Sequence, residues 1–278
     1  MKVGYQGVDG AFSSIAAKVL FPNSVYVSFK TFTDVLEAVK NAEIDTGVVP
    51  IENSYAGRVA GMHNLFKDFC DKKLFITHEK MLKIEHCLCG VEDSNIDDIT
   101  HIFSHEQALM QCQMNISNVL PNAVCSAKGN TAMAAQFVSE NNNHYYAAIC
   151  SKDACRRYGL KILQENFQDV DDNYTLFVAL SKKQNTIPAN TSNVLTSMIF
   201  EITNKSGSLC SCLECLEKQD LDLVKIESYI PTTSSTSAMF FATIRGNMED
   251  TNMKKAVQNL YSLVKNIYIF GSYITERK

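Results

Sequence analysis

The chain has 278 residues, of which 46% are hydrophobic and 20% charged, with a net charge of -4 and a pI near 5.9. Its length predicts two domains, and a mildly acidic chain gives no electrostatic reason to expect nucleic acid as a partner. No apolar run approaches the roughly 20 residues of a membrane span, which argues against a membrane protein.

The first 182 residues alternate short apolar runs with helical patterns, as a mixed or parallel α/β sheet requires. The expected strands cover 2–7, 24–29, 46–50, 73–90 (a strand pair or crossover), 101–104, 123–127, 146–151, 160–167 and 174–180, with a loop at 51–57. The expected helices cover 12–20, 31–42, 105–119, 130–141 and 152–159. From residue 101 onward, a short strand, a polar residue and a helix follow one another three times.

A polar stretch at 181–193 contains a proline and predicts a linker. The elements expected after it are a strand at 194–203, a helix at 208–219, a strand at 221–230, a loop at 232–237, a strand at 238–246, a helix at 250–266 and a strand at 267–274. This is the β-α-β-β-α-β order of a ferredoxin-like domain. The predicted organisation is a first domain over 1–182, a linker over 183–194 and a second domain over 195–278.

Ten cysteines occur in the chain, but their spacing does not indicate a metal site. Neither Cys87 with Cys89 nor the group Cys210, Cys212 and Cys215 has the paired spacing of a zinc site or a histidine beside it. We interpret the cysteines as core and surface residues, and expect no metal and no cofactor. With no signal peptide visible, the expected location is the cytoplasm.

Thr175 needs an account of its own, because it completes an N-x-T glycosylation sequon that a cytoplasmic protein would not use. It belongs to a set of residues placed where predicted strands end or helices begin. The set is Gly7, Gly10, Ser13, Asn53, Ser54, Gly57, Ser104, His105, Gln107, Asn130, Thr131, Asn173 and Thr175. Each alone also fits a helix cap or turn. Together they predict a cleft of neutral hydrogen-bond donors that suits a small anion.

The motifs of the prephenate dehydratase family are matched in order by YQGVDGAFS, VPIENSYAG, SHEQALMQC, NTAMAA, AAICSKDACRRYGLKIL and DDNYTLFVAL. The chain resembles this family over essentially its whole length. Residues 207–228 and the closing GSY resemble the ACT regulatory domain. Arogenate dehydratases are similar to the chain to the same degree.

The resemblance implies a two-lobed catalytic domain like that of periplasmic binding proteins, with the active site between the lobes, followed by a ferredoxin-like ACT domain. It implies a lyase of phenylalanine biosynthesis, one of the aromatic amino acid pathways, that converts prephenate to phenylpyruvate with loss of carbon dioxide and water. It also implies a homodimer or homotetramer under allosteric inhibition by L-phenylalanine.

The resemblance assigns roles residue by residue. Thr175 would hydrogen-bond or protonate the departing ring hydroxyl. The substrate-binding residues would be Ser13, Asn53, Ser54, Gly57, Ser104, His105, Gln107, Thr131, Asn173 and Phe177. The effector-binding residues would be Gly207, Ser208, Leu209, Glu227 and Ser228.

The chain departs from the family's N-x-T-R-F motif at Leu176, where the resemblance implies an arginine that pairs with a substrate carboxylate. A buried substrate carboxylate without that cationic partner would bind less favourably by about 2–5 kcal/mol. Arg58 is a candidate to supply the positive charge in place of the arginine. The effector motif also differs from the family at four positions, Asp222, Val224, Tyr229 and Ile230. These changes predict weak or absent inhibition by phenylalanine, which would leave the second domain chiefly a dimerisation role.

Three alternatives to prephenate dehydratase remain open at this point. Arogenate dehydratase differs only in a substrate amine that replaces an oxo group. A non-aromatising prephenate decarboxylase would keep the fold and lose carbon dioxide without expelling the hydroxyl. A non-catalytic sensor of an aromatic acid would fit the loss of the arginine at position 176.

Overall fold

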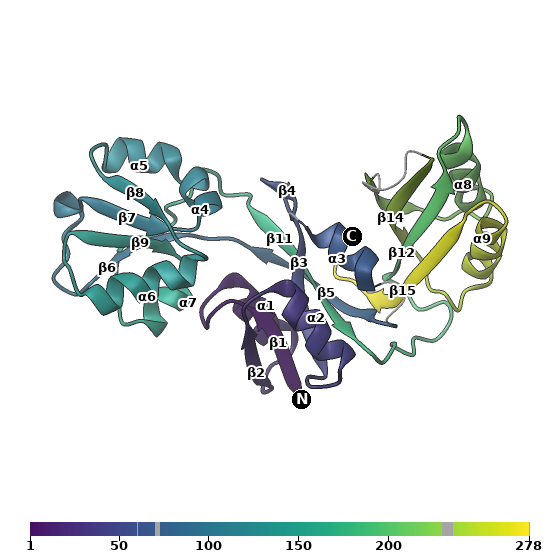
Figure 1. Ribbon diagram of the computed structural model, residues 1–278, viewed down its shortest axis with the longest axis horizontal. Coiled ribbons are helices and arrows are strands. Elements are labelled where there is room, and N and C mark those ends of the chain that lie inside the picture. Colours follow the sequence, from purple (N-terminus) through teal and green to yellow (C-terminus); the bar gives the residue numbers. More distant parts are fainter. Residues whose placement is uncertain (60, 70–72, 230–235, 278) are drawn as a thin grey trace. The chain divides into compact units, whose positions relative to one another are not determined.

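The computed structural model describes residues 1–59, 61–69, 73–229 and 236–277 of an α/β protein with three sheets (Figure 1). The chain packs into two compact units. The first contains Met1–Val35, Val48–Gly57 and Met81–Phe177, and the second contains Leu36–Gly47, Arg58–Lys80 and Val178–Lys278. Within the described ranges, no helix is both long enough and apolar enough to cross a membrane.

The six-stranded sheet has the order β2-β1-β3-β11-β5, with β4 paired to β3. Its strands are β1 (Lys2–Gln6), β2 (Val25–Phe29), β3 (Thr46–Asn53), β4 (Gly57–Arg58), β5 (Phe75–Lys83) and β11 (Tyr174–Ser181). The helices in these parts of the chain are α1 (Phe12–Leu20), α2 (Phe32–Lys40) and α3 (Met62–Phe69). β3 and β11 are buried along nearly their whole length, which explains their continuous apolar sequences.

The five-stranded sheet belongs entirely to the first unit and has the order β10-β6-β9-β7-β8. Its strands are β6 (Cys87–Gly90), β7 (His101–Ser104), β8 (Val124–Ala127), β9 (Tyr146–Cys150) and β10 (Lys161–Gln164). Its helices are α4 (Glu106–Gln111), α5 (Gln113–Val119), α6 (Thr131–Asn141) and α7 (Lys152–Arg157), with a 3-10 turn at Ile96–Asp98. α6 and α7 cover one face, and α4 and α5 cover the other (Figure 1). Because β7 pairs in parallel with β8 and β9, the helices that follow these strands begin at one edge of the sheet.

The chain crosses between these two sheets twice. Residues 84–86 link β5 to β6, and residues 165–173 link β10 to β11. The crossover segments are hydrogen-bonded to each other, from Ile84 N to Asn173 O (2.7 Å) and from Phe167 N to His86 O (2.7 Å). Two sheets joined by paired crossovers confirm the predicted two-lobed fold class.

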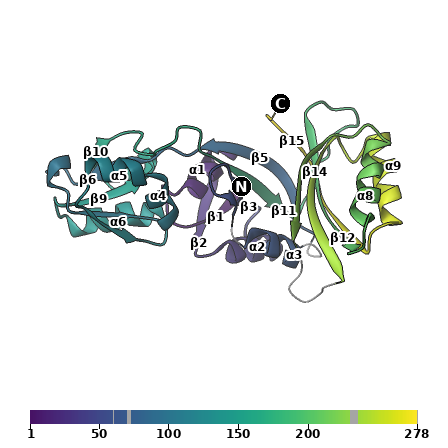
Figure 2. The same ribbon diagram turned by 90° about the horizontal axis from the view of Figure 1, so that it is seen from above.

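The four-stranded sheet has the order β13-β14-β12-β15, and every neighbouring pair is antiparallel. Its strands are β12 (Val194–Thr203), β13 (Leu223–Tyr229), β14 (Ser237–Arg245) and β15 (Asn266–Ile274). Two helices, α8 (Ser208–Glu217) and α9 (Thr251–Tyr261), cover one face, where Cys212 and Val257 join an apolar cluster with Phe200 and Phe240 (Figure 2). The ferredoxin-like order is confirmed.

Most predicted elements occur at the expected places, and the main differences are as follows. β3 continues through Asn53, so residues 51–53 are strand and not loop. The helix predicted at 105–119 is two helices that meet at Cys112, whose φ of -118 is outside the helical range. Helix α3 was not predicted, and most of the predicted loop at 232–237 lies outside the described residues. The predicted domain limits at 182 and 195 remain a prediction.

Candidate active site

Three of the predicted site residues form a hydrogen-bonded cluster where β3 ends and β11 begins. Asn53 Nδ2 donates to Asn173 Oδ1 (2.8 Å), to Thr175 Oγ1 (3.0 Å) and to the Tyr174 carbonyl oxygen (3.1 Å). Asn53, Asn173 and Thr175 are 7%, 2% and 8% exposed. β3 and β11 are neighbours in the sheet, which brings together residues 120 positions apart in the sequence.

The amide of Asn53 has a defined orientation. Its Oδ1 accepts from the backbone N–H groups of Tyr55 (3.1 Å) and Ala56 (2.8 Å). Because a backbone N–H can only donate, these two bonds identify the amide oxygen. The NH2 group must therefore be the part that faces β11.

The hydroxyl of Thr175 accepts a hydrogen bond from Asn53, so its own proton is available for a further acceptor. Hydrogen bonds in series polarise one another, so the bond from Asn53 makes Thr175 a better donor. An amide cannot take a proton from the hydroxyl, so Asn53 does not activate Thr175 as a nucleophile. The arrangement suits donation to an oxygen atom that gains negative charge.

Asn173 presents a donor that the described residues leave unpaired. Its Nδ2 is buried and has no hydrogen-bond partner in this part of the chain. The residue is held on two sides, because its Oδ1 accepts from Asn53 and its carbonyl oxygen accepts from Ile84 N. An unpaired buried donor costs about 1–3 kcal/mol, which an oxygen atom of a bound ligand would relieve.

Ser54 and Gly57 complete the turn after β3. Ser54 Oγ donates to the Asp172 carbonyl oxygen (3.1 Å) and accepts from Tyr174 N (2.8 Å), so it joins the turn to the start of β11. Gly57 is exposed and has a φ of +73, a conformation that favours glycine.

Phe177 and Leu176 lie on opposite faces of β11, because side chains alternate along a strand. Both are 2% exposed. Phe177 shares the face of Thr175, and Leu176 points the other way. An arginine at position 176 would therefore point to the face opposite Thr175, and the loss of a substrate partner at this position remains a prediction.

A second group of predicted residues surrounds the β1–α1 loop. Ser13 and Thr131 lie in the first turns of α1 and α6, and both are 7% exposed. The loop approaches the start of α6, since a Cβ atom added at Gly7 would lie 3.2 Å from Asn130 Nδ2. Asn130 caps α6 by accepting from Met133 N (2.8 Å). The positive ends of α1 and α6 favour an anion in this region.

The three predicted residues at the junction of β7 and α4 already have bonds within the fold or a capping role. Ser104 is fully buried, and its Oγ donates to the Ile149 carbonyl oxygen (2.6 Å). His105 is the N-cap of α4 and accepts at Nδ1 from Gln107 N (3.3 Å). Their predicted contacts with a substrate remain a prediction.

Arg58 belongs to the second unit and has partners in β13 of the same unit. Its Nη2 donates to the Ser228 carbonyl oxygen (3.2 Å), and its Nε lies 3.7 Å from Glu227 Oε2. Lys225 Nζ lies 3.3 Å from the other carboxylate oxygen of Glu227. The guanidinium that was a candidate to replace the missing arginine therefore already has partners in β13.

The predicted effector residues lie at two places in the ferredoxin-like part. Gly207, with a φ of +83, precedes α8, whose first residues are Ser208 and Leu209. Glu227 and Ser228 lie in β13. Asp222, one of the altered positions, pairs with Arg245 at 3.5 Å.

His86 was not predicted, although its segment is hydrogen-bonded to the segment that ends at Asn173. It is 1% exposed, its Nε2 lies 3.0 Å from Gln111 Oε1, and its ring meets Phe12 edge-on at 5.5 Å. Burial lowers the pKa of His86 more than the bond to Gln111 raises it, so the ring is neutral at pH 7. The sequence signal that could have found it is a histidine in a segment that links two apolar strands.

The cysteines fit the core interpretation. Seven of them are buried in the described part of the chain, including Cys87, Cys89, Cys212 and Cys215, whereas Cys125 and Cys210 are exposed. No group of three or more His, Cys, Asp or Glu side chains in the described ranges is placed to hold a metal ion.

Comparisons with known proteins identify the family of the chain. The sequence model of the family described as prephenate dehydratase matches residues 3–185. A protein of Arabidopsis thaliana, arogenate dehydratase/prephenate dehydratase 1, chloroplastic, is 33% identical over 287 residues, covering 98% of this chain and 72% of that protein.

Two solved structures have nearly the same fold. One is GqqA, described as a novel type of quorum quenching acylase, with 28% identity and a TM-score of 0.90 over 99% of this chain and 98% of its own. The other is the prephenate dehydratase of Arthrobacter aurescens in complex with L-Phe, with 24% identity and a TM-score of 0.89 over 99% and 90%. The family match contains the whole Asn53–Asn173–Thr175 cluster, and the chain belongs to the prephenate dehydratase family.

Proposed function

We propose that the protein is a prephenate dehydratase, a carbon–oxygen lyase that converts prephenate to phenylpyruvate. The observation that carries this proposal is the bond from Asn53 to Thr175, which leaves the proton of a buried hydroxyl free to donate. The family match and the unpaired amide of Asn173 support it.

The reaction needs a hydrogen-bond donor at the departing ring hydroxyl and groups that bind the two carboxylates of the substrate. The bond between the ring and its carboxylate breaks, and its electron pair enters the ring as the bond to the ring hydroxyl breaks. Prephenate dianion and one proton then give phenylpyruvate monoanion, carbon dioxide and water. Aromatisation supplies the driving force, so orientation and donation to the departing oxygen are the protein's main tasks.

In our proposal, the O–H group of Thr175 donates to the departing hydroxyl. The Asn53 amide polarises Thr175, and Asn173 Nδ2 donates to an oxygen atom of the substrate. Ser13 and Thr131, at the positive ends of α1 and α6, would hold carboxylate oxygens. Phe177 offers an apolar surface on the face of Thr175, and the remaining predicted contacts are Ser54, Gly57, Ser104, His105 and Gln107.

An acylase activity, as in the description of GqqA, is less well supported by this site. Acyl transfer by a hydroxyl requires a base that takes its proton. The bond recorded for Thr175 comes from an amide, and an amide is not such a base. Donation from Thr175 therefore fits the geometry better than attack by it.

One assay separates the candidate reactions. The full-length protein is incubated with prephenate and, separately, with arogenate, and the products are followed by absorbance and chromatography. Phenylpyruvate supports our proposal, and phenylalanine from arogenate alone identifies an arogenate dehydratase. A non-aromatic decarboxylated product identifies a prephenate decarboxylase. Binding of prephenate without turnover identifies a sensor and refutes the enzyme.

We also propose that residues 195–278 form an ACT domain and that the protein is a cytoplasmic homodimer or homotetramer. The ferredoxin-like order supports the domain assignment, and the family's usual assembly supports the oligomer. Residues 1–182 would then form the catalytic domain and 183–194 the linker.

Phenylalanine is expected to bind weakly or not at all to the full-length protein. Arg58 and Lys225 lie beside the Glu227 carboxylate, so the chain's own cations already occupy the partner of an amino acid's ammonium group. Calorimetric titration with L-phenylalanine, with D-phenylalanine as control, tests this expectation. A dissociation constant in the low micromolar range, which corresponds to a binding free energy of about -8 kcal/mol, would contradict it.

Replacing Arg58 with alanine is expected to leave kcat/KM for prephenate within about threefold of the wild type. The guanidinium is bonded to β13, and its pair with Glu227 is part-exposed, so stability should fall by at most about 1 kcal/mol. Arg58→Lys serves as the charge-preserving control. A hundredfold loss in Arg58→Ala that Arg58→Lys restores would show that Arg58 pairs with the substrate after all.

A further inference from the structure

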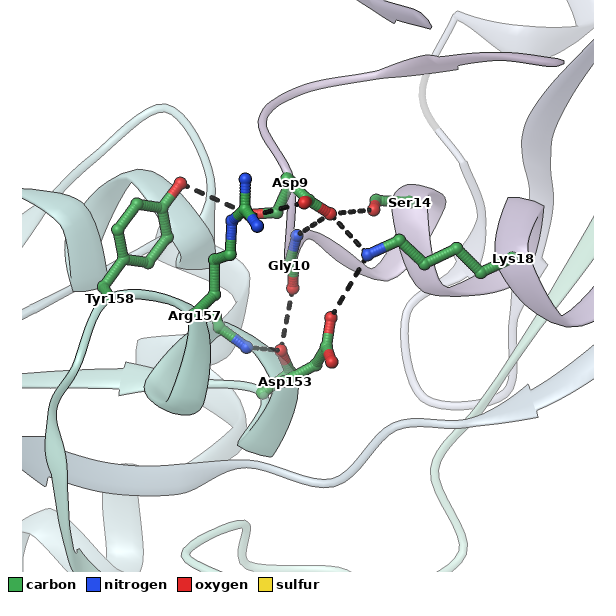
Figure 3. A network of polar contacts seen from close by, with 9 residues as sticks. Asp9, Gly10, Ser14, Lys18, Asp153, Arg157 and Tyr158 are labelled. Atoms are coloured by element: carbon green, nitrogen blue, oxygen red, sulfur yellow. Dashed lines mark hydrogen bonds and ion pairs between the residues drawn. The ribbon is translucent and has the colours of Figure 1, made fainter. Parts of the chain in front are cut away.

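The carboxylate of Asp9 accepts hydrogen bonds from the β1–α1 loop and from helix α1 (Figure 3). Its Oδ1 accepts from Gly10 N (3.1 Å), Ser14 Oγ (2.9 Å) and Lys18 Nζ (2.5 Å). Ser14 and Lys18 are four residues apart and therefore lie on one face of α1. Asp9 thus fixes the loop to the helix that begins with Phe12 and Ser13.

The same residue fixes the loop to α7, on the five-stranded sheet. Arg157 Nε lies 3.3 Å from Asp9 Oδ2, and Tyr158 donates its hydroxyl to the Asp9 carbonyl oxygen (3.2 Å). Ser151, the N-cap of α7, donates to the Gly10 carbonyl oxygen (2.8 Å). The loop is therefore bonded to both ends of α7 (Figure 3).

Close packing accompanies these bonds. Gly10 has a φ of +90, and a Cβ atom there would lie 2.8 Å from Ala154 Cα, so only glycine fits. Ala11 is buried in the apolar cluster that contains Ala132 of α6 and Ala154 of α7, and Val8 packs against it. The loop is thus a joint between the two lobes of the first unit.

The charge at this joint is balanced by more than one cation. Partial burial would raise the pKa of Asp9, but bonds from Lys18 and Ser14 and the charges of Lys18 and Arg157 hold that pKa below its ordinary value. Asp153 lies 3.7 Å from Lys18 and shares it. Asp9 is therefore ionised at neutral pH and attracts both helices.

The position of this joint matters for the site. Ser13 follows the loop directly, and the loop's Gly7 lies close to Asn130, next to Thr131. A displaced loop would change the separation between Ser13 and Thr131, the two residues that hold carboxylates in the proposed function. Misplaced groups would hold the substrate carboxylates less well in the ground state and in the transition state alike, which raises KM more than it lowers kcat.

We propose that Asp9 is a positioning residue of the active site: its carboxylate joins α1 to α7 and so sets the distance between Ser13 and Thr131. The proposal rests on the proposed function. Asp9 itself does not touch the reacting atoms. It acts through the loop, by holding two lobes at the separation that fits the substrate.

The test compares Asp9→Asn and Arg157→Gln with the wild type, using prephenate and the full-length protein. Asparagine keeps the shape and an acceptor for Gly10 N and Ser14, but it removes the charge. We expect the KM for prephenate to rise about tenfold in each variant, with kcat within about threefold. Because both substitutions remove one shared contact, the double variant should be no worse than the poorer single variant.

A matched control is available on the same helix. Lys152 at the start of α7 pairs with Glu165 at 2.6 Å, and both side chains are about half exposed. Glu165→Gln removes an ion pair of α7 that does not involve the loop, so KM should not change. The Arg157 side chain is 61% exposed, so Arg157→Gln should fold. This variant therefore tests the proposal even if Asp9→Asn does not fold.

The outcomes are distinct. An unchanged KM in Asp9→Asn and Arg157→Gln, or a loss of melting temperature and active fraction without a change in KM, would overturn the positioning role. Equal KM changes in Glu165→Gln would also overturn it. A wild type that does not turn over prephenate would instead refute the proposed function on which this role depends.

Discussion

Replacement of Thr175 with alanine is expected to lower kcat for prephenate about 10²–10⁴-fold, the usual contribution of a positioned proton donor. KM should change little, because the hydroxyl acts on the oxygen that departs in the transition state. The fold should survive, since the two N–H bonds of Asn53 Nδ2 still have the Asn173 side chain and the Tyr174 carbonyl as acceptors. The loss of stability should be about 1 kcal/mol.

Two variants control this prediction. Thr175→Ser keeps a hydroxyl and should retain most of the activity. Thr46→Ala removes another buried threonine hydroxyl, one that donates to the Leu180 carbonyl oxygen of β11 (3.0 Å), and should change stability without changing kcat. If Thr175→Ala kept more than about a tenth of the wild-type kcat, the donor role would be refuted.

The fold was predictable because the hydrophobic pattern of each segment matches the helix or strand that the segment forms in the packed structure. The alternation of short apolar strands and helices from residue 101 onward corresponds to β7, β8 and β9 with α4, α6 and α7, and the ferredoxin-like order follows from period and length alone. The break at Cys112 was not predictable in this way. The sequence 105–119 has one helical pattern, and Asp169, from a distant loop, bonds to the N–H groups of Met114 and Asn115 at the start of the second helix.

The residues proposed for the site could be selected from the sequence, but the contacts among them could not be predicted. Asn53 and Thr175 were recognised from the ends of strands and from family motifs, yet nothing local shows that the amide of one bonds the hydroxyl of the other. That contact depends on β3 and β11 being neighbours, which is a property of the sheet order. The partner of Arg58 was missed for the same reason, because β13 lies about 170 residues further along the chain.

Asp9 shows a different limit. It stands inside a motif that was recognised, and its partners Ser14 and Lys18 are four residues apart, which places them on one face of α1. Its link to α7 is carried by Arg157 and Tyr158, nearly 150 residues away, and no sequence rule pairs these residues. A charged residue in a motif can therefore have structural partners that the motif itself does not indicate.

Restoring the family's arginine with Leu176→Arg is expected to destabilise the protein by about 3–5 kcal/mol and to leave kcat/KM of the folded fraction no higher than that of the wild type. Leu176 is 2% exposed, so an arginine there would bring a charge into an environment shaped for an apolar side chain. It would also point away from the face of Thr175, because adjacent strand residues alternate. The change therefore adds a desolvation cost without adding a partner for the substrate.

Chemical denaturation and steady-state kinetics on the same preparations separate the two effects. Leu176→Met, which nearly preserves volume and lacks charge, should cost less than about 1.5 kcal/mol and serves as the control. A stable Leu176→Arg variant with a lower KM for prephenate would mean that this position does reach a substrate carboxylate. The alternation of β11 would then be interrupted near Thr175, and the assignment of Thr175 and Leu176 to opposite faces would be wrong.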